Sequence, residues 1–405
     1  MTSNGHLVKA TSQRLILTAI NAMHALVHVN LHAVPLLYPA LRDHFGFGYM
    51  GIAVLTLTSQ IAIGSTQISF GALTRLARRF QILGIGNALA FIGSILLAVA
   101  PNYALLVLAR VVRGLGISPY HPVGGAIMAS SFPRDRAKAL GLFRTSGGVG
   151  TLIAPLMVGA MLHLWGWRPV VFVLGAPFLL ASIFCFWVRE TADEAYLKSR
   201  EKKSDRFGLQ EYKALLQDRN ALIISLTMVI SAGGRIGGVM KTYLAVILVD
   251  RFEISVAFAA VFFTAYSIGE VVGPLTLGWL SDRTSPLMVV RFNLALSALF
   301  LLLILYPAVP GIMLGLIVFM AGLFIGSRTS LMQALLIQSG PQDARIDTQL
   351  SLYFTIGAIS GPIWTLLIAA LIDHFGMASA LWTMALSFVF GMIILSFVRP
   401  ASPAK

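Results

Sequence analysis

The sequence predicts an all-α membrane protein with about twelve transmembrane helices, and composition and length both indicate this. Of its 405 residues, 57% are hydrophobic and 11% are charged, whereas a soluble domain carries about 25% charged residues. The mean hydropathy is +0.82. A spanning helix needs roughly 20 apolar residues, so each span with its loop takes about 30–34 residues and the chain holds about twelve. Cys185 is the only cysteine, which excludes an internally disulfide-bonded secreted domain.

The charged residues predict the orientation in the bilayer. The net charge is +14, and 21 of the 30 Lys and Arg residues fall in loops that we assign to the cytoplasm. Only Arg42, Arg168 and Arg251 fall in the opposite loops. This bias is the positive-inside rule and does not indicate a nucleic-acid partner. We therefore expect a multi-pass protein with both termini in the cytoplasm.

Hydropathy places six spans in each half of the chain, joined by short connections such as Pro101-Asn102 that make neighbouring helices antiparallel. The predicted spans are 14–37, 49–71, 79–100, 103–132, 138–163, 168–188, 220–248, 255–280, 286–306, 311–337, 346–372 and 376–398. Arg189 to Arg219 holds eight basic and seven acidic residues and divides the two sets. We predict an amino-terminal six-helix bundle (1–189), a cytoplasmic linker (190–219) and a carboxy-terminal six-helix bundle (220–405).

The two halves carry related strings at equivalent positions. Gly71 to Arg79 follows the second span, and Gly278 to Thr284 follows the eighth. Gly150-Thr-Leu-Ile-Ala-Pro155 lies in the fifth span, and Gly357-Ala-Ile-Ser-Gly-Pro362 lies in the eleventh. Internal repeats of this kind are typical of secondary transporters.

These strings resemble the signatures of the major facilitator superfamily. Gly278 to Arg283 is similar to its loop signature G-x-L-[small]-D-[RK], and Arg110 to Gly116 is similar to its fourth-span signature. Gly150 to Gly159 resembles its fifth-span antiporter signature, with Ala154 where the family usually has Gly. The resemblance covers the whole chain. It implies two six-helix pseudo-repeats around a central cavity lined by spans 1, 4, 7 and 10.

A narrower resemblance is to the fosmidomycin-resistance branch of that family, which implies a bacterial inner membrane and a role in drug resistance. It depends on His24, on Leu55 to Gln60 with Gln67, on Tyr120-His121-Pro122, and on Gly147-Gly148. Besides Ala154, the sequence departs from the expected patterns at two positions. Arg75 stands where the amino-half loop has Asp, and His28 stands where the branch commonly has Asp.

Basic residues greatly outnumber acidic residues inside the spans. Glu270 is the only carboxylate at mid-membrane depth, against Arg110, Arg113, Arg144, Arg235, Lys241 and Arg328. An ionisable group in hydrocarbon costs about 2.5–3.5 kcal/mol and usually faces a cavity or a partner. The predicted substrate-binding residues are His24, His28, Arg110, Arg113, Arg235, Lys241 and Arg328, and they favour an anion because guanidinium groups bind carboxylate or phosphate. The alternative is a structural role for these cations.

Histidines recur along the first span. Asn21, His24, His28 and His32 lie on one helical face. His24, Glu270 and Arg110 are the candidates for proton coupling. The alternatives are a buried, hydrogen-bonded polar stripe against span 5 or another cavity helix, and a fixed ion pair of Glu270 with Arg235, Lys241 or Arg328. Three histidines on one straight helix are poor metal geometry, so we predict no metal and no cofactor.

Conformational change is expected to involve the repeated strings. The candidate gating residues are Gly278, Asp282, Arg283, Gly150, Pro155, Gly361, Pro362 and His121. His121 lies between Pro119 and Pro122, so it equally fits a helix-breaking structural element.

No nucleotide-binding or hydrolase signature is present in the sequence, so we do not expect an enzyme. We expect a monomeric proton-coupled exporter of a small anionic compound or drug, working by alternating access. The alternatives are an importer or facilitator of a small organic anion, such as a carboxylate or phosphorylated metabolite, and a receptor that uses the transporter fold without transport.

The topology can be tested with single cysteines in a Cys185→Ser background. A cysteine at Lys202 should be inaccessible to a membrane-impermeant maleimide in intact cells, and one at Asp373 should be labelled. Labelling at position 202 from outside would reverse the predicted orientation.

Overall fold

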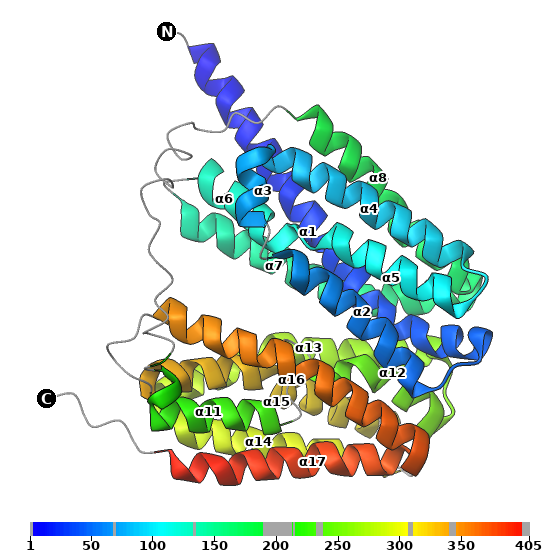
Figure 1. The fold of residues 1–405 in the computed structure, drawn as a ribbon, viewed down its shortest axis with the longest axis vertical. Helices are drawn as coiled ribbons and strands as arrows, with labels where there is room; N and C mark the ends of the chain where they lie inside the picture. The colour runs from blue at the N-terminus through cyan, green and yellow to red at the C-terminus, as the bar shows by residue number, and fades with distance from the viewer. Residues whose placement is uncertain are drawn as a thin grey trace, which may run out of the picture. The chain divides into compact units, whose positions relative to one another are not determined.

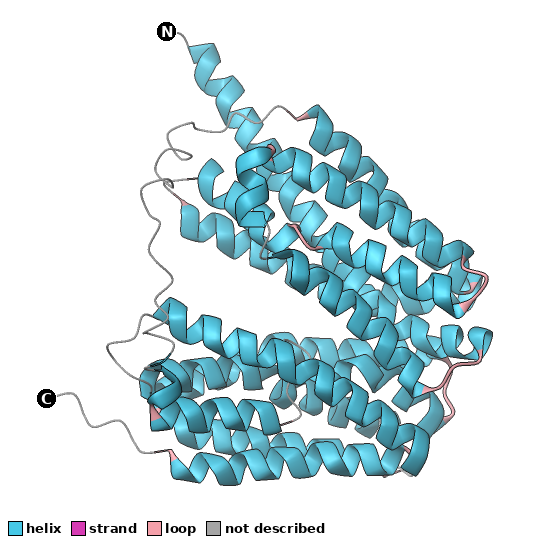
Figure 2. Ribbon diagram, viewed as in Figure 1, coloured by secondary structure: helices cyan, strands magenta, loops and turns pink. Residues whose placement is uncertain are grey.

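The computed structural model describes residues 3–67, 70–132, 135–188, 213, 215–231, 238–306, 311–339 and 346–398. These residues form helices joined by short loops, and no strand occurs among them (Figure 2). The chain forms two compact units, Met1–Gly46 with Val54–Asp205 and Phe47–Ala53 with Arg206–Lys405, which we call the amino-terminal and carboxy-terminal units. Most of the predicted linker, residues 190–212 and 214, lies outside the described residues.

Each of the six spans predicted in the amino-terminal half overlaps at least one helix. The helices are α1 (Ser3–Phe45), α2 (Tyr49–Gln67), α3 (Phe70–Leu76), α4 (Arg79–Val99), α5 (Tyr103–Ile117), α6 (Gly125–Ser131), α7 (Arg136–Trp165) and α8 (Trp167–Trp187) (Figure 1). The Asn102 side chain caps α5 by accepting from the Leu105 amide at 2.9 Å. Gly166 has φ +72°, a conformation that lets the chain reverse directly from α7 into α8.

The carboxy-terminal unit repeats this pattern. Its helices are α11 (Arg219–Ile230), α12 (Gly238–Phe252), α13 (Val256–Arg283), α14 (Pro286–Leu303), α15 (Gly311–Ser339), α16 (Ile346–Phe375) and α17 (Met377–Ile394). Gly376 has φ +81° before the last helix of this half, as Gly166 has before α8. Among the described residues, eight helices are long and apolar enough to cross a membrane. The other four predicted spans are 49–71, 103–132, 220–248 and 346–372, of which 346–372 lies on the 30-residue helix α16.

One predicted span is not continuous. Instead of a single helix over 103–132, α5 ends at Ile117, a π-helical turn occupies Tyr120–Gly124, and α6 begins at Gly125. Pro119 and Pro122 have no backbone N–H to donate, so the regular α-helical ladder cannot run through them. The interruption that the Pro119-Tyr-His-Pro122 sequence suggests is therefore present, and π-helical turns are frequent at functional sites.

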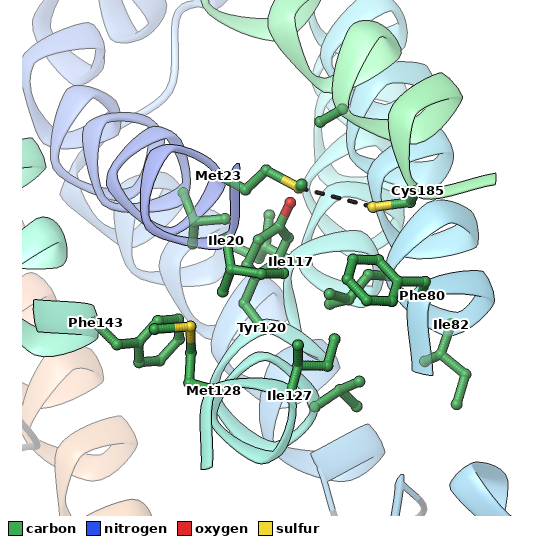
Figure 3. Packing of buried hydrophobic residues seen from close by; sticks show 14 of the residues in the cluster. Ile20, Met23, Phe80, Ile82, Ile117, Tyr120, Ile127, Met128, Phe143 and Cys185 are labelled. Atoms are coloured by element: carbon green, nitrogen blue, oxygen red, sulfur yellow. Dashed lines mark hydrogen bonds between the residues drawn. The ribbon is translucent and has the colours of Figure 1, made fainter. Parts of the chain in front are cut away.

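The π-helical turn is anchored in the core of the amino-terminal unit. Tyr120 is fully buried among side chains from α1, α4, α6, α7 and α8 (Figure 3). Its hydroxyl donates to the Asn87 side-chain oxygen. The Asn87 amide in turn contacts Met23 Sδ at 3.8 Å and Cys185 Sγ at 3.7 Å. This buried group holds the backbone on either side of His121 in place.

Small residues let α13 and α15 approach closely. Gly269 and Gly273 on α13, and Gly322 and Gly326 on α15, each form a Gly-x-x-x-Gly pair. A Cβ on Gly322 would lie 2.1 Å from the Tyr266 carbonyl oxygen, and one on Gly269 would lie 2.2 Å from that of Phe319. The two backbones are thus in direct contact, as is typical of packed membrane helices.

Gly322→Ala should destabilise the protein by about 1–3 kcal/mol, because the added methyl group collides with backbone that cannot move aside. Gly315→Ala on the same helix is the matched control, since its Cβ would meet only the Phe262 ring at 3.6 Å. Thermal unfolding of the two purified variants in detergent measures the difference. Equal midpoints would contradict the close-contact interpretation.

Candidate functional site

Two buried arginines lie on α5 in the amino-terminal unit. Arg110 and Arg113 are 7% and 3% exposed and face the same way, three residues apart. Arg110 Nε donates to the Leu55 carbonyl at 3.3 Å. Arg113 donates to the Asn30 side-chain oxygen and, at 3.4 Å, to the Asn30 carbonyl. No described carboxylate pairs with either arginine, so neutral dipoles stabilise these two charges.

The carboxy-terminal unit uses a different arrangement. Lys241 on α12 forms a buried ion pair with Glu270 on α13, the two residues being 6% and 8% exposed. Lys241 is one of the three partners considered for Glu270. Arg328 on α15 is 2% exposed and donates to the Ser231 hydroxyl at 3.4 Å. Arg235 lies outside the described residues.

The histidines of α1 contact α7, which holds the fifth predicted span. His24 Nδ1 lies 2.7 Å from the Phe143 carbonyl oxygen, and His28 Nδ1 lies 3.2 Å from the Thr151 hydroxyl. His121, in the π-helical turn, brings its ring centroid to 5.1 Å from that of His24 and 5.7 Å from that of His28. Three predicted site residues from two distant parts of the sequence are thus brought together.

Some predicted gating residues lie at an exposed helix end, and others lie at close contacts between helices. Asp282 and Arg283 are exposed at the end of α13, and the Arg283 guanidinium lies 4.0 Å from the Trp279 ring centroid. Asp282 makes no ion pair with the described residues, and the Arg75 side chain is outside them. In contrast, a Cβ on Gly150 would lie 2.3 Å from the Ala25 carbonyl oxygen, so this glycine is needed for close packing of α1 on α7.

The other gating candidates lie inside helices or away from contacts. Pro155 is buried within α7, Gly361 is buried within α16, and Pro362 follows it on the same helix. No heavy atom lies within 4 Å of the position of a Cβ on Gly278. Arg144, the remaining in-span cation of the amino-terminal half, is exposed.

Two residues that position the site were not predicted. Asn30, 1% exposed, accepts from Arg113 and donates to the carbonyls of Leu26 and Leu174. Its signal was available, because it is a polar residue between His28 and His32 in an apolar span. Thr151 holds His28, but a single threonine in an apolar helix carries no signal of that role.

Glu270→Gln should lower the free energy of unfolding by about 3–5 kcal/mol, because it leaves the Lys241 ammonium group buried without its counter-charge. Replacing both members, Lys241→Met with Glu270→Leu, should recover most of the loss. Thermal unfolding of the purified variants tests this, with Asp282→Asn, exposed on the same helix, as the control. An unchanged unfolding midpoint in Glu270→Gln would show that the ion pair between Lys241 and Glu270 contributes nothing to stability.

Known proteins resemble the chain in sequence at low identity. It is 27% identical over 188 residues to the multidrug resistance protein Stp of Mycobacterium tuberculosis, covering 45% of this chain and about a third (35%) of that protein's length. It is 26% identical over 278 residues to the fosmidomycin resistance protein of Escherichia coli K12, covering 68% of this chain and 67% of that protein.

The fold is also similar to that of solved transporters. The crystal structure of the nucleoside transporter NupG superposes with a TM-score of 0.82 at 12% identity, over 96% of this chain and all of that one. The family model described as Major Facilitator Superfamily matches residues 20–248 and 236–405. These matches and the apolar helices make the chain a multi-pass membrane transporter and not an enzyme. It belongs to the Major Facilitator Superfamily.

Proposed function

We propose that this transporter is a monomeric proton-coupled exporter of small anionic organic compounds or drugs, working by alternating access in a bacterial inner membrane with both termini in the cytoplasm. The observation that carries the proposal is the excess of buried positive charge. Arg110 and Arg113 have no carboxylate partner among the described residues, whereas Lys241 is neutralised by Glu270.

The substrate class follows from the cost of this charge. A cation or neutral compound placed against Arg110 and Arg113 leaves their positive charge uncompensated in a low-dielectric site. An anion instead accepts charge-assisted hydrogen bonds, each worth about 1.5–3 kcal/mol. We therefore expect a substrate with at least one carboxylate, phosphonate or phosphate group.

The direction of transport is supported by the fifth-span string and by the names of relatives. Gly150 to Gly159 resembles an antiporter signature, and two matched proteins are called resistance proteins. A membrane transporter gives resistance by removing a compound from the cell. Inward proton flow would drive this export, with His24, Glu270 and Arg110 as the candidate groups for coupling.

One observation favours a second candidate, the uptake of an anion together with a proton. Glu270 neutralises Lys241 while it is ionised. Protonation of Glu270 would free the Lys241 charge for an anion, so proton and anion would bind together rather than in alternation. That linkage is the requirement for symport.

Arg328→Gln should weaken binding of the transported anion about tenfold or more, which corresponds to about 1.4 kcal/mol. Arg328→Lys should restore only part of the affinity, because the two-pronged guanidinium geometry is lost. Binding of a panel of radiolabelled carboxylates and phosphonates to protein in detergent measures this. Arg291→Gln removes the same charge from a predicted cytoplasmic helix end and is the control.

Flux into or out of proteoliposomes under an imposed pH gradient separates the two candidates. Export is supported if the anion moves against the proton flow, and symport is supported if it moves with the protons. Tight binding of a lipophilic cation, unchanged in Arg328→Gln, would contradict the anion proposal altogether.

A further inference from the structure

Three histidines form a compact cluster inside the amino-terminal unit. His24 and His28 come from α1 and His121 comes from the π-helical turn, and one ring nitrogen of each lies within 4.8 Å of the others. The ring planes meet at 74° for His24 and His28, 85° for His24 and His121, and 90° for His28 and His121. The three rings are therefore close together and steeply inclined to one another, and the third comes from outside α1.

The hydrogen bonds of His24 determine which nitrogen holds its proton. Its Nδ1 lies 2.7 Å from the Phe143 carbonyl oxygen, and a carbonyl can only accept, so Nδ1 is the donor. In the neutral ring, Nε2 then carries a lone pair. The residue is 2% exposed, and Nε2 is buried without a hydrogen-bond partner. A buried polar atom without a partner is costly, so the lone pair of this nitrogen is suited to bind a ligand.

His28 is held in the same tautomer by Thr151. The Thr151 hydroxyl donates its one proton to the Gly147 carbonyl at 3.0 Å, so it must accept from His28 Nδ1–H at 3.2 Å. This leaves Nε2 of His28 as the ring's lone-pair nitrogen. A metal-binding histidine usually donates a hydrogen bond from its other ring nitrogen to an oxygen atom, which fixes the tautomer and the ring orientation.

The surroundings leave room for these rings and give access to them. A Cβ on Gly147 would lie 2.8 Å from His24 Cε1 and 2.9 Å from His28 Nε2, so only glycine fits beside the pair. His121 is exposed, whereas its neighbour Tyr120 is fully buried and bonded to Asn87. The third histidine is thus presented at an accessible edge by a fixed turn.

We propose that His24, His28 and His121 bind a divalent transition-metal ion through one imidazole nitrogen each. Neutral nitrogen ligands suit Zn²⁺, Cu²⁺ or Ni²⁺, whereas Mg²⁺ and Ca²⁺ require oxygen ligands. Three histidines leave the fourth tetrahedral position for water or an anionic group. This inference is independent of the proposed anion transport.

Zn²⁺ binding to the purified protein tests the proposal. The protein should be purified with an affinity tag that contains no histidine. Titration calorimetry should give one Zn²⁺ per chain, and Co²⁺ should show the d–d absorption of a tetrahedral nitrogen site. His121→Ala, an exposed change, should weaken Zn²⁺ binding by more than about tenfold, because losing a ligand costs at least as much as losing a supporting residue. His32→Ala is the matched control, since His32 lies on the same face of α1 but outside the cluster.

A second pair of variants tests the support of His28 without removing a ligand. Thr151→Val should weaken Zn²⁺ binding by about tenfold. Thr145→Val should not, because Thr145 makes the equivalent hydroxyl bond to Gly141 at 3.0 Å on the same helix and is exposed. Size-exclusion profiles test whether each variant is folded. If His121→Ala does not fold, the comparison of Thr151→Val with Thr145→Val decides whether the metal site exists. Binding of less than one Zn²⁺ per chain would overturn the proposed metal site. An equal loss of Zn²⁺ affinity in a variant and its control, for either pair, would overturn it as well. Neither result would contradict the anion proposal.

Discussion

Positive charge buried inside apolar helix bundles is the constraint on which the rest of this structure depends. Each such charge costs about 2.5–3.5 kcal/mol to insert, and the described residues meet the cost in two ways. Lys241 is paired with Glu270 in the carboxy-terminal unit, so its charge is compensated. Arg110 and Arg113 are instead bonded to oxygens of Leu55 and Asn30, which stabilise a guanidinium group without cancelling it.

Close backbone packing makes these solutions possible. A Cβ on Gly326 would lie 2.8 Å from Glu270 Cα and 2.9 Å from its Cγ, so the approach of α15 to α13 constrains where the Glu270 carboxylate can lie. Gly114 likewise lets α5 approach α2 closely, because a Cβ on Gly114 would lie 2.9 Å from the Ser59 carbonyl oxygen. The glycines contribute no chemistry of their own. They fix the distances at which the charged side chains meet their partners.

The π-helical turn has a comparable role for the histidines. Two prolines remove backbone donors from the fourth predicted span, and the buried bond between Tyr120 and Asn87 fixes the irregular segment that results. His121 therefore lies beside His24 and His28, although nearly a hundred residues separate them in the chain. A local departure from helical periodicity is what turns a stripe of histidines on one helix into a three-sided cluster.

The sequence by itself determined the fold class, most of the helical spans and the family, because each follows from local hydropathy or from contiguous strings such as Gly278 to Arg283. It also determined which polar residues lie within the spans, since these residues stand inside contiguous apolar stretches of the sequence. Only the tertiary structure decided that Glu270 pairs with Lys241, that Asn30 holds Arg113, and that His121 meets His24 and His28. These are contacts between helices distant in the chain, and a helical period states which residues share a face but not which neighbouring helix that face meets.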